Sequence, residues 1–355
     1  MPLGGLPVSM GAAGRQQSRT SKSDRKAVNI SRATAAWLGA ALLLLSAHPP
    51  LADAADPAPA ISVHAGKADS LNHALAMQFA AAVATGNTAL TLQVEESQGS
   101  VQNIIDATHR SGGFVFTTAP NLIAQAKRGD KPFPHNARYR EIRALFPIPP
   151  LTVHWVVRAD SGIAHFADLA THPFIPGGKG SFGERQTASA LHVLGLDDRV
   201  PLIDIDAAGA QNALVGKQVS GLALAGTFPL PAVVELAHAT PIRLLSLTPE
   251  QLKKVLAGDD SIRPQVIPGG IYPGIDDDTH TVAQPVGAYT TTRMSEKLAY
   301  AITKSFWSQR AALIGRNPAW AAVTPAALAS LGTTLHPGAL RYYREAGIKV
   351  PAAIR

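Results

Sequence analysis

Short apolar segments alternate with amphipathic segments along most of this sequence, and that alternation constrains the fold more than any other feature. Residues 61–64 alternate apolar and polar side chains as a strand does, and Leu71, Leu75, Phe79 and Val83 then recur at the spacing of one helical face. Strands that alternate with helices predict a largely parallel sheet with helices on both faces. The length of 355 residues is enough for two such sheets, so the sequence predicts a two-domain α/β protein.

Cap and turn signals place further elements along the chain. Ser70 and Ser295 stand where helix N-caps are expected, and Gly99-Ser100 opens another helix. Thr248 begins a Thr-Pro-Glu-Gln segment, which has the pattern of a capping box. Further strands are predicted at residues 90–94, 114–116, 151–157, 174–175, 202–204, 222–224 and 242–245.

The composition excludes several classes of protein. Hydrophobic residues make up 46% of the chain and charged residues only 16%, which argues against a disordered chain. The net charge is +7, but six basic and two acidic side chains lie in residues 1–54, so +4 of this charge belongs to that segment. The high isoelectric point is therefore weak evidence for nucleic-acid binding. The chain has no cysteine, which excludes disulfides, thiolate zinc sites and cysteine nucleophiles.

Residues 1–54 have the order of a secretory signal peptide. A basic stretch up to Arg32 precedes the apolar run 33–45, and Ala52-Asp53-Ala54 has the small-x-small pattern of a cleavage site. The apolar run is shorter than the roughly 20 residues that a membrane-spanning helix needs. The alternatives are a buried core helix or a single membrane anchor. We predict cleavage after Ala54, export by the general route and a periplasmic location.

Two local patterns suggest rival chemistries. Residues 178–183 match G-x-G-x-x-G, and Asp204 follows at about the distance of a ribose-binding acid, as in a nicotinamide-dependent oxidoreductase. The preceding strand is short and flanked by prolines, so a tight strand-to-helix turn is the preferred interpretation. Residues 276–278 are three aspartates, with His280 close by; a solvated acidic loop is preferred to a metal site. We expect no cofactor, no metal and no catalytic residue.

Five segments together resemble the TAXI-type solute receptors of tripartite ATP-independent periplasmic (TRAP) transporters. The strongest match is the tail at residues 335–347, followed by residues 156–163 with 166–169 after them; the other matches are the Gly-Ser-Val segment at 99–104 and the acidic loop at 267–278. The resemblance implies a type II periplasmic-binding-protein fold, in which two open mixed sheets are joined by a hinge around a ligand cleft. It also implies that a small organic anion or amino acid is captured for an ion-driven membrane permease.

The resemblance also gives domain boundaries. It implies a signal peptide at residues 1–54, a first lobe at 55–146 plus 288–355, and a second lobe at 147–287. The chain is expected to cross between the lobes near residues 146–153 and 286–292. An alternative partner for the same fold is a membrane sensor to which the receptor presents its ligand.

The predicted ligand-binding residues lie in the loops that follow strands and open helices, where open α/β sheets bind ligands. They are Gly66, Lys67, Ser70, Gly99, Ser100, Thr117, Thr118, Lys179, Gly180, Ser181, Gly226, Thr227, Phe228 and Tyr272. For each hydroxyl group the alternative is helix capping or turn chemistry. The first loop, at residues 65–70, lacks the Gly-Gly-Thr-Tyr-Tyr of the family it resembles, so the ligand class stays open.

Overall fold

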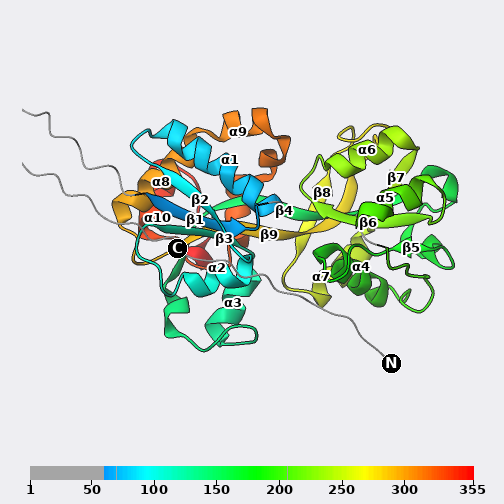
Figure 1. Ribbon diagram of the computed structural model, residues 1–355, viewed down its shortest axis with the longest axis horizontal. Coiled ribbons are helices and arrows are strands. Elements are labelled where there is room, and N and C mark those ends of the chain that lie inside the picture. Colours follow the sequence, from blue (N-terminus) through cyan, green and yellow to red (C-terminus); the bar gives the residue numbers. More distant parts are fainter. Residues whose placement is uncertain (1–59, 69, 206) are drawn as a thin grey trace, which may run out of the picture. The chain divides into compact units, whose positions relative to one another are not determined.

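The computed structural model describes residues 60–355 apart from 69 and 206 (Figure 1). The predicted signal peptide, residues 1–54, lies outside the described residues. In the part of the chain that is described, no helix has both the length and the apolar character needed to cross a membrane.

Nine strands form one hydrogen-bonded sheet within the described residues. They are β1 (Ile61–Gly66), β2 (Leu92–Glu96), β3 (Phe114–Thr118), β4 (Ile142–Arg158), β5 (Phe174–Ile175), β6 (Gly221–Gly226), β7 (Ile242–Leu244), β8 (Arg263–Ile267) and β9 (Thr279–Thr291). The order along the sheet is β2-β1-β3-β9-β4-β6-β5, with β7 paired to β4 and β8 paired to β9.

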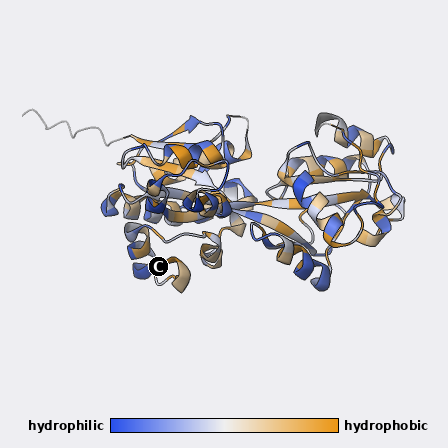
Figure 2. Cartoon of the chain, turned by 90° about the horizontal axis from the view of Figure 1, so that it is seen from below, coloured by the Kyte–Doolittle hydropathy of each residue, from blue (hydrophilic) through white to orange (hydrophobic). Residues whose placement is uncertain are grey.

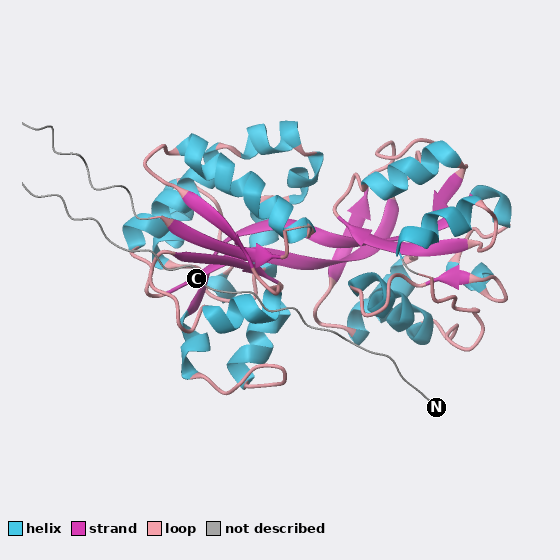
Figure 3. Cartoon of the chain, viewed as in Figure 1, coloured by secondary structure: helices cyan, strands magenta, loops and turns pink. Residues whose placement is uncertain are grey.

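Helices connect most of these strands (Figure 3). The α-helices of the described residues are α1 (Leu71–Gly86), α2 (Ser100–Asp106), α3 (Pro120–Arg128), α4 (Phe182–Val193), α5 (Ala207–Val215), α6 (Pro231–Ala239), α7 (Pro249–Gly258), α8 (Glu296–Ser308), α9 (Arg310–Arg316) and α10 (Pro337–Glu345). Short 3₁₀ segments lie at Ala137–Glu141, Ala159–Ser161, Phe166–Leu169, Pro318–Ala322, Pro325–Ser330 and Ala352–Ile354.

The long strands β4 and β9 make the sheet mixed. β1 pairs in parallel with β2 and β3, and β5 pairs in parallel with β6. In contrast, β9 runs antiparallel to β3, β4 and β8, and β4 runs antiparallel to β6 and β7. The α/β class with mixed strands is confirmed. The prediction of a largely parallel sheet was wrong, because most pairings in the described sheet, those of β4 and β9, are antiparallel. The two predicted sheets are linked into one, because β4 and β9 pair along most of their lengths.

β4 is longer than the strand predicted at residues 151–157, because it also passes through the prolines that precede that segment. Pro147, Pro149 and Pro150 lack the N–H that a ladder needs, yet the strand begins at Ile142 and continues to Arg158. Its register with β9 shifts between Ala144 and Phe146, and again between Ile148 and Leu151. Such irregularities tolerate residues that cannot donate to the ladder. The prediction of a strand at residues 202–204 was wrong, since Leu202 forms only an isolated bridge to Phe174.

Separate hydrophobic cores lie at the two ends of the strands β4 and β9, and we call the surrounding regions the first and second lobes. The first-lobe core draws on residues 61–148 and 286–354. At its centre Phe146 and Phe306 stack with ring centroids 3.9 Å apart. The second lobe has one core under α4 and α7 and another under α5 and α6. Helices therefore cover both faces of its sheet, as predicted (Figure 1).

The cores follow the alternation seen in the sequence. Apolar residues gather along the strands and on the helix faces that meet them, while polar residues face outward (Figure 2). The predicted helix starts at Ser70, Gly99, Thr248 and Ser295 are confirmed as N-caps. At Thr248 both hydrogen bonds of the capping box are present. Local cap chemistry thus fixes where several helices begin.

Candidate functional site

Three helices of the first lobe begin at the carboxyl ends of its parallel strands. α1 follows β1, α2 follows β2 and α3 follows β3. Their first turns line a cavity of about 200 Å³, which residues of β4 and β9 also line. We call it the helix-start cavity, and its lining residues are Ser70, Leu71, Asn72, Ser100, Ala119, Leu122, Leu151, Gln284 and Val286. It lies where open α/β sheets bind ligands.

The loop before α1 is shaped by Gly66 and Ser70. Gly66 has φ +147°, and an added Cβ would stand 2.8 Å from the Ser70 hydroxyl, so a side chain here would be strained. The Ser70 hydroxyl donates to the Lys67 carbonyl at 2.7 Å and accepts from the His73 amide at 3.2 Å. Ser70 therefore caps α1 and lines the cavity at the same time.

The start of α2 is tied to the ends of two strands. Gly99, at φ +100°, is the N-cap, and its amide donates to the Ser97 hydroxyl at 3.3 Å. The buried Asn103 side chain donates to the carbonyls of His64 and Thr117, at 3.2 and 3.0 Å. These bonds join α2 to β1 and β3, which places Ser100 at the cavity.

The start of α3 has no side-chain cap. Ala119 is its N-cap residue, with Pro120 in the first turn, and no side chain bonds to the first amides. Proline is well suited to this position because its missing N–H would be unpaired there anyway. Ala119 and Leu122 contribute a small apolar surface to the cavity.

Pairing between β4 and β9 sets the remaining wall. Leu151 lies opposite Gln284 in this ladder, and both line the cavity. None of the described residues that line it is charged: the side chains are hydroxyl, amide or apolar. Amide N–H groups at helix starts carry partial positive charge and favour anions. The cavity can therefore accept a small solute that has an anionic or polar group and an apolar part.

The structure brings only part of the predicted first-lobe set to this cavity. Ser70 and Ser100 line it, and Gly66 and Gly99 shape the loops beside them. Lys67 is exposed and does not line it. Thr117 and Thr118 are fully buried at the end of β3, with their hydroxyls directed to the carbonyls of Ala65 and Ala119.

The glycine loop of the second lobe lies at a separate small pocket. Lys179 lines that pocket together with Glu184 and Asp204, and Ser181 caps α4 by accepting from the Glu184 amide at 3.1 Å. The Gly180 amide donates to the Glu184 carboxylate. A dinucleotide needs such an amide for its pyrophosphate, and here it already faces an anion. The strand before this loop, β5, has only two residues.

The remaining second-lobe candidates lie after β6. Gly226 pairs with Thr152 of β4, next to the cavity residue Leu151. Thr227 is buried, and Phe228 packs against the core under α5 and α6. Tyr272 is only 2% exposed and belongs to that core, so its hydroxyl lies inside the second lobe and not in the helix-start cavity.

Sequence reasoning missed several lining residues, above all Leu122, Leu151 and Gln284. Leu122 lies one turn beyond the Thr117-Thr118 segment that was singled out, so the position of α3 was a usable signal. Leu151 and Gln284 lie in strands that meet only in the folded chain. No local pattern marks them.

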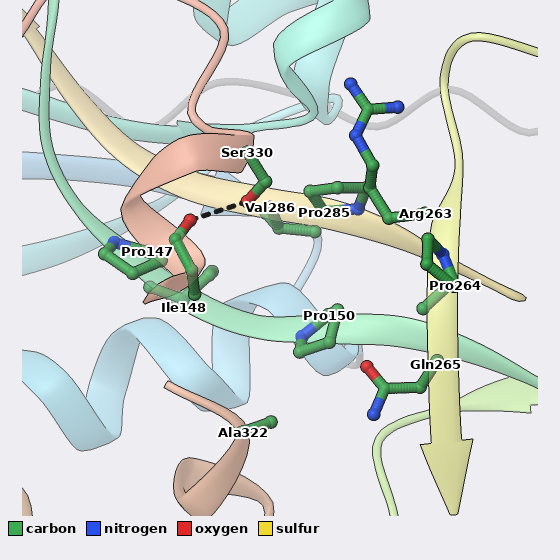
Figure 4. Close-up of a pocket in the computed structure, with 12 residues that line it drawn as sticks. Pro147, Ile148, Pro150, Arg263, Pro264, Gln265, Pro285, Val286, Ala322 and Ser330 are labelled. Atoms are coloured by element: carbon green, nitrogen blue, oxygen red, sulfur yellow. Dashed lines mark hydrogen bonds between the residues drawn. The ribbon is translucent and has the colours of Figure 1, made fainter. Parts of the chain in front are cut away.

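A second cavity, of about 160 Å³, lies beside the same two strands. Figure 4 shows Pro147, Ile148 and Pro150 of β4 on one side of it, with Pro264 and Gln265 of β8 on another. The Arg263 guanidinium at its rim donates to the carbonyls of Asp260 and Ile262, at 2.8 and 2.6 Å. The pocket is thus mainly proline and aliphatic surface.

The acidic loop forms internal bonds. The Asp278 carboxylate accepts from the Gly269 amide at 2.9 Å. Among the described residues, no group of three or more histidine or acidic side chains has the arrangement of a metal site. The Asp276–Asp278 segment instead lines a surface pocket together with His165 and Arg243.

Fold and cavity together define a two-lobed α/β protein with a small cavity beside its connecting strands. Solved structures with a similar fold include a TctC solute binding protein from Polaromonas (16% identity, 77% of this chain and 88% of that chain, TM-score 0.49). Another is MatC from Rhodopseudomonas palustris with bound malate (12% identity, 80% of this chain and 98% of that chain, TM-score 0.45). A third is a periplasmic sulfonate-binding protein, SsuA, from Methylobacillus flagellatus (8% identity, 75% of this chain and 72% of that chain, TM-score 0.46).

The family is shown by the sequence itself. The model of the NMT1-like family matches residues 70–347, which is most of the chain and includes both lobes. The protein therefore belongs to the NMT1-like family.

Proposed function

We propose that this protein is a periplasmic solute-binding protein of the TAXI type, which captures a small organic anion or amino acid for the ion-driven permease of a TRAP transporter. The observation that carries the proposal is the helix-start cavity. Three helix starts face it, and hydroxyl and amide side chains stand beside aliphatic ones. This combination holds a small polar solute without offering it a reactive group. We propose no catalytic step.

The proposed cycle uses β4 and β9 as the hinge. The first lobe would comprise residues 55–146 and 288–355 and the second 147–287. Solute would bind first to the helix starts, and closure would bring the second-lobe loops at Lys179, Ser181 and Thr227 towards it. A ligand drives such closure only through its higher affinity for the closed form. The segment 1–54 would export the chain and be removed after Ala54.

The first test is a thermal-shift screen of the protein purified from the periplasm of an expression host. The panel contains amino acids, monocarboxylates, dicarboxylates and nicotinamide nucleotides. A solute at about 100 times its dissociation constant adds about 2.7 kcal/mol of stability, which raises the melting temperature by several degrees. Stabilisation by an organic anion or amino acid supports the proposal. Stabilisation by a nicotinamide nucleotide alone contradicts it.

A pair of variants at Leu151 tests the predicted charge of the solute. Leu151 is half-buried in the cavity wall, so a polar side chain of similar length is tolerated. Leu151→Glu and Leu151→Gln change the shape almost equally, but only the first adds a negative charge. For an anionic solute, Leu151→Glu should weaken binding at least about tenfold more than Leu151→Gln, which corresponds to about 1.4 kcal/mol. Equal losses would indicate a neutral solute. Ser189→Ala in α4, which does not line the cavity, serves as the unaffected control.

A further inference from the structure

Tyr272 takes part in a buried chain of hydrogen bonds that runs across the second lobe. Its hydroxyl lies 2.8 Å from Nε2 of His154 and accepts from the Leu230 amide at 2.9 Å. Nδ1 of His154 lies 3.2 Å from the Thr152 carbonyl. This hydrogen-bond network therefore joins β4, the loop before β9 and the loop that follows β6.

The direction of each hydrogen bond follows from the groups involved. The Thr152 carbonyl can only accept, so Nδ1 of His154 carries the proton and Nε2 of the neutral ring is an acceptor. The Tyr272 hydroxyl must then donate to Nε2, and its oxygen is left to accept from the Leu230 amide. His154 is 1% exposed, and this burial lowers its pKa to about 4, so the ring is neutral at pH 7. Each of these four groups, the Thr152 carbonyl, the His154 ring, the Tyr272 hydroxyl and the Leu230 amide, therefore has a hydrogen-bond partner.

This hydrogen-bond network ends at the loop that joins β6 to α6, residues 227–230. At one end of the loop, Gly226 is held in the ladder opposite Thr152, whose neighbour Leu151 is a cavity residue. At the other end, Leu230 is the N-cap residue of α6 and has no side-chain cap; its amide bonds to Tyr272 instead. The Leu230 side chain also folds back on Gly226, where an added Cβ would meet it at 2.6 Å.

We infer that Tyr272 is a positioning residue, which acts through His154 and the Leu230 amide to hold residues 227–229, the loop between β6 and α6, in place. Its functional meaning rests on the proposed function, because the held loop carries Thr227 and Phe228 of the second-lobe side. Sequence reasoning had placed Tyr272 in contact with the solute. Its burial assigns it to the support of that loop instead.

Hydrogen exchange of the Leu230 amide tests this inference in the full chain without any solute. Tyr272→Phe removes the acceptor of that amide and should lower its protection factor about tenfold. The matched control is Tyr343→Phe. Tyr343 is also fully buried, donates to the Leu145 carbonyl at 2.7 Å and accepts from Trp307 at 3.0 Å, but it lies in the first lobe. This control should leave Leu230 unchanged. Equal exchange in Tyr272→Phe and the wild type, or equal acceleration in both variants, would overturn the inference.

The pH profile of the same amide provides a second readout that needs no variant. Tyr272 is the titratable group that faces the His154 ring, and the ring centroids lie 5.7 Å apart in an edge-on arrangement. A protonated ring cannot accept from Tyr272, so Leu230 protection in the wild type should fall more than that of other second-lobe amides as the pH is lowered through about 4. Tyr272→Phe should lack this additional step. A wild-type profile without the step contradicts the inference, even if Tyr272→Phe fails to fold.

Calorimetric binding of L-glutamate to the same proteins separates this inference from the proposed function. If wild-type protein binds it, Tyr272→Phe should bind about tenfold more weakly and Tyr343→Phe equally well. If wild-type protein binds neither L-glutamate nor any member of the panel, the proposed function is contradicted. The exchange experiments then still decide whether Tyr272 holds the loop.

Discussion

Acid should destabilise this protein in part through a buried histidine, His154. Burial lowers the pKa of His154 from its ordinary value of 6.5 to about 4, because the charged ring would lose its hydration inside the second lobe. At any pH between these two values, the His154 ring is therefore mostly protonated in the unfolded chain and mostly neutral in the folded chain. Stability from this residue is fully present above pH 6.5 and is lost as the pH falls towards 4.

The size of the effect follows from the two pKa values. Each unit of difference corresponds to about 1.36 kcal/mol, so this residue alone should remove about 2 kcal/mol by pH 5 and about 3 kcal/mol by pH 4. Other groups change stability in the same range. His336, for example, also has a pKa lowered by burial. The His154 contribution must therefore be measured as a difference between two proteins.

The assay is urea unfolding of the wild type and of His154→Gln, followed by circular dichroism at pH 7, 5 and 4. Glutamine keeps a hydrogen-bonding side chain but does not titrate, so the variant should lose about 3 kcal/mol less than the wild type between pH 7 and 4. The absolute stability of the variant at pH 7 does not matter for this comparison. Parallel pH profiles, within about 0.5 kcal/mol, would refute the reasoning by showing that His154 titrates normally in the folded protein.

Three further substitutions test the packing and the caps by urea unfolding at pH 7. Phe306→Ala removes a fully buried ring that stacks in the first-lobe core and should cost about 3–5 kcal/mol. Ser70→Ala removes the N-cap of α1 and should cost about 1 kcal/mol; no loss would show that the cap is dispensable. Gly338→Ala should cost about 1–3 kcal/mol, because the added carbon would lie 2.1 Å from the Glu296 carbonyl oxygen. Its control is Gly178→Ala, whose added carbon meets no atom within 4 Å and should be neutral.

The positions that the sequence determined by itself are those set by short-range chemistry. Ser70 and Thr248 cap their helices through amides three residues further along, so the signal and its partner lie in the same segment. The apolar spacing of Leu75, Phe79 and Val83 likewise predicts the buried face of α1, whereas Leu71, predicted on the same face, is 36% exposed and lines the cavity. In the same way, placing loops after strands was enough to find Ser70 and Ser100 at the cavity.

Only the tertiary structure decided the rest of the cavity and the role of Tyr272. Leu151 and Gln284 face each other because of the register between β4 and β9, two strands far apart in the sequence. Nothing around either residue encodes that register; it is set by which faces of the two strands are buried in the cores. Tyr272 was a reasonable solute contact by its loop position. In the folded protein its hydroxyl points inward to His154, because a buried tyrosine hydroxyl needs a partner. That partner lies on β4, far away in the sequence.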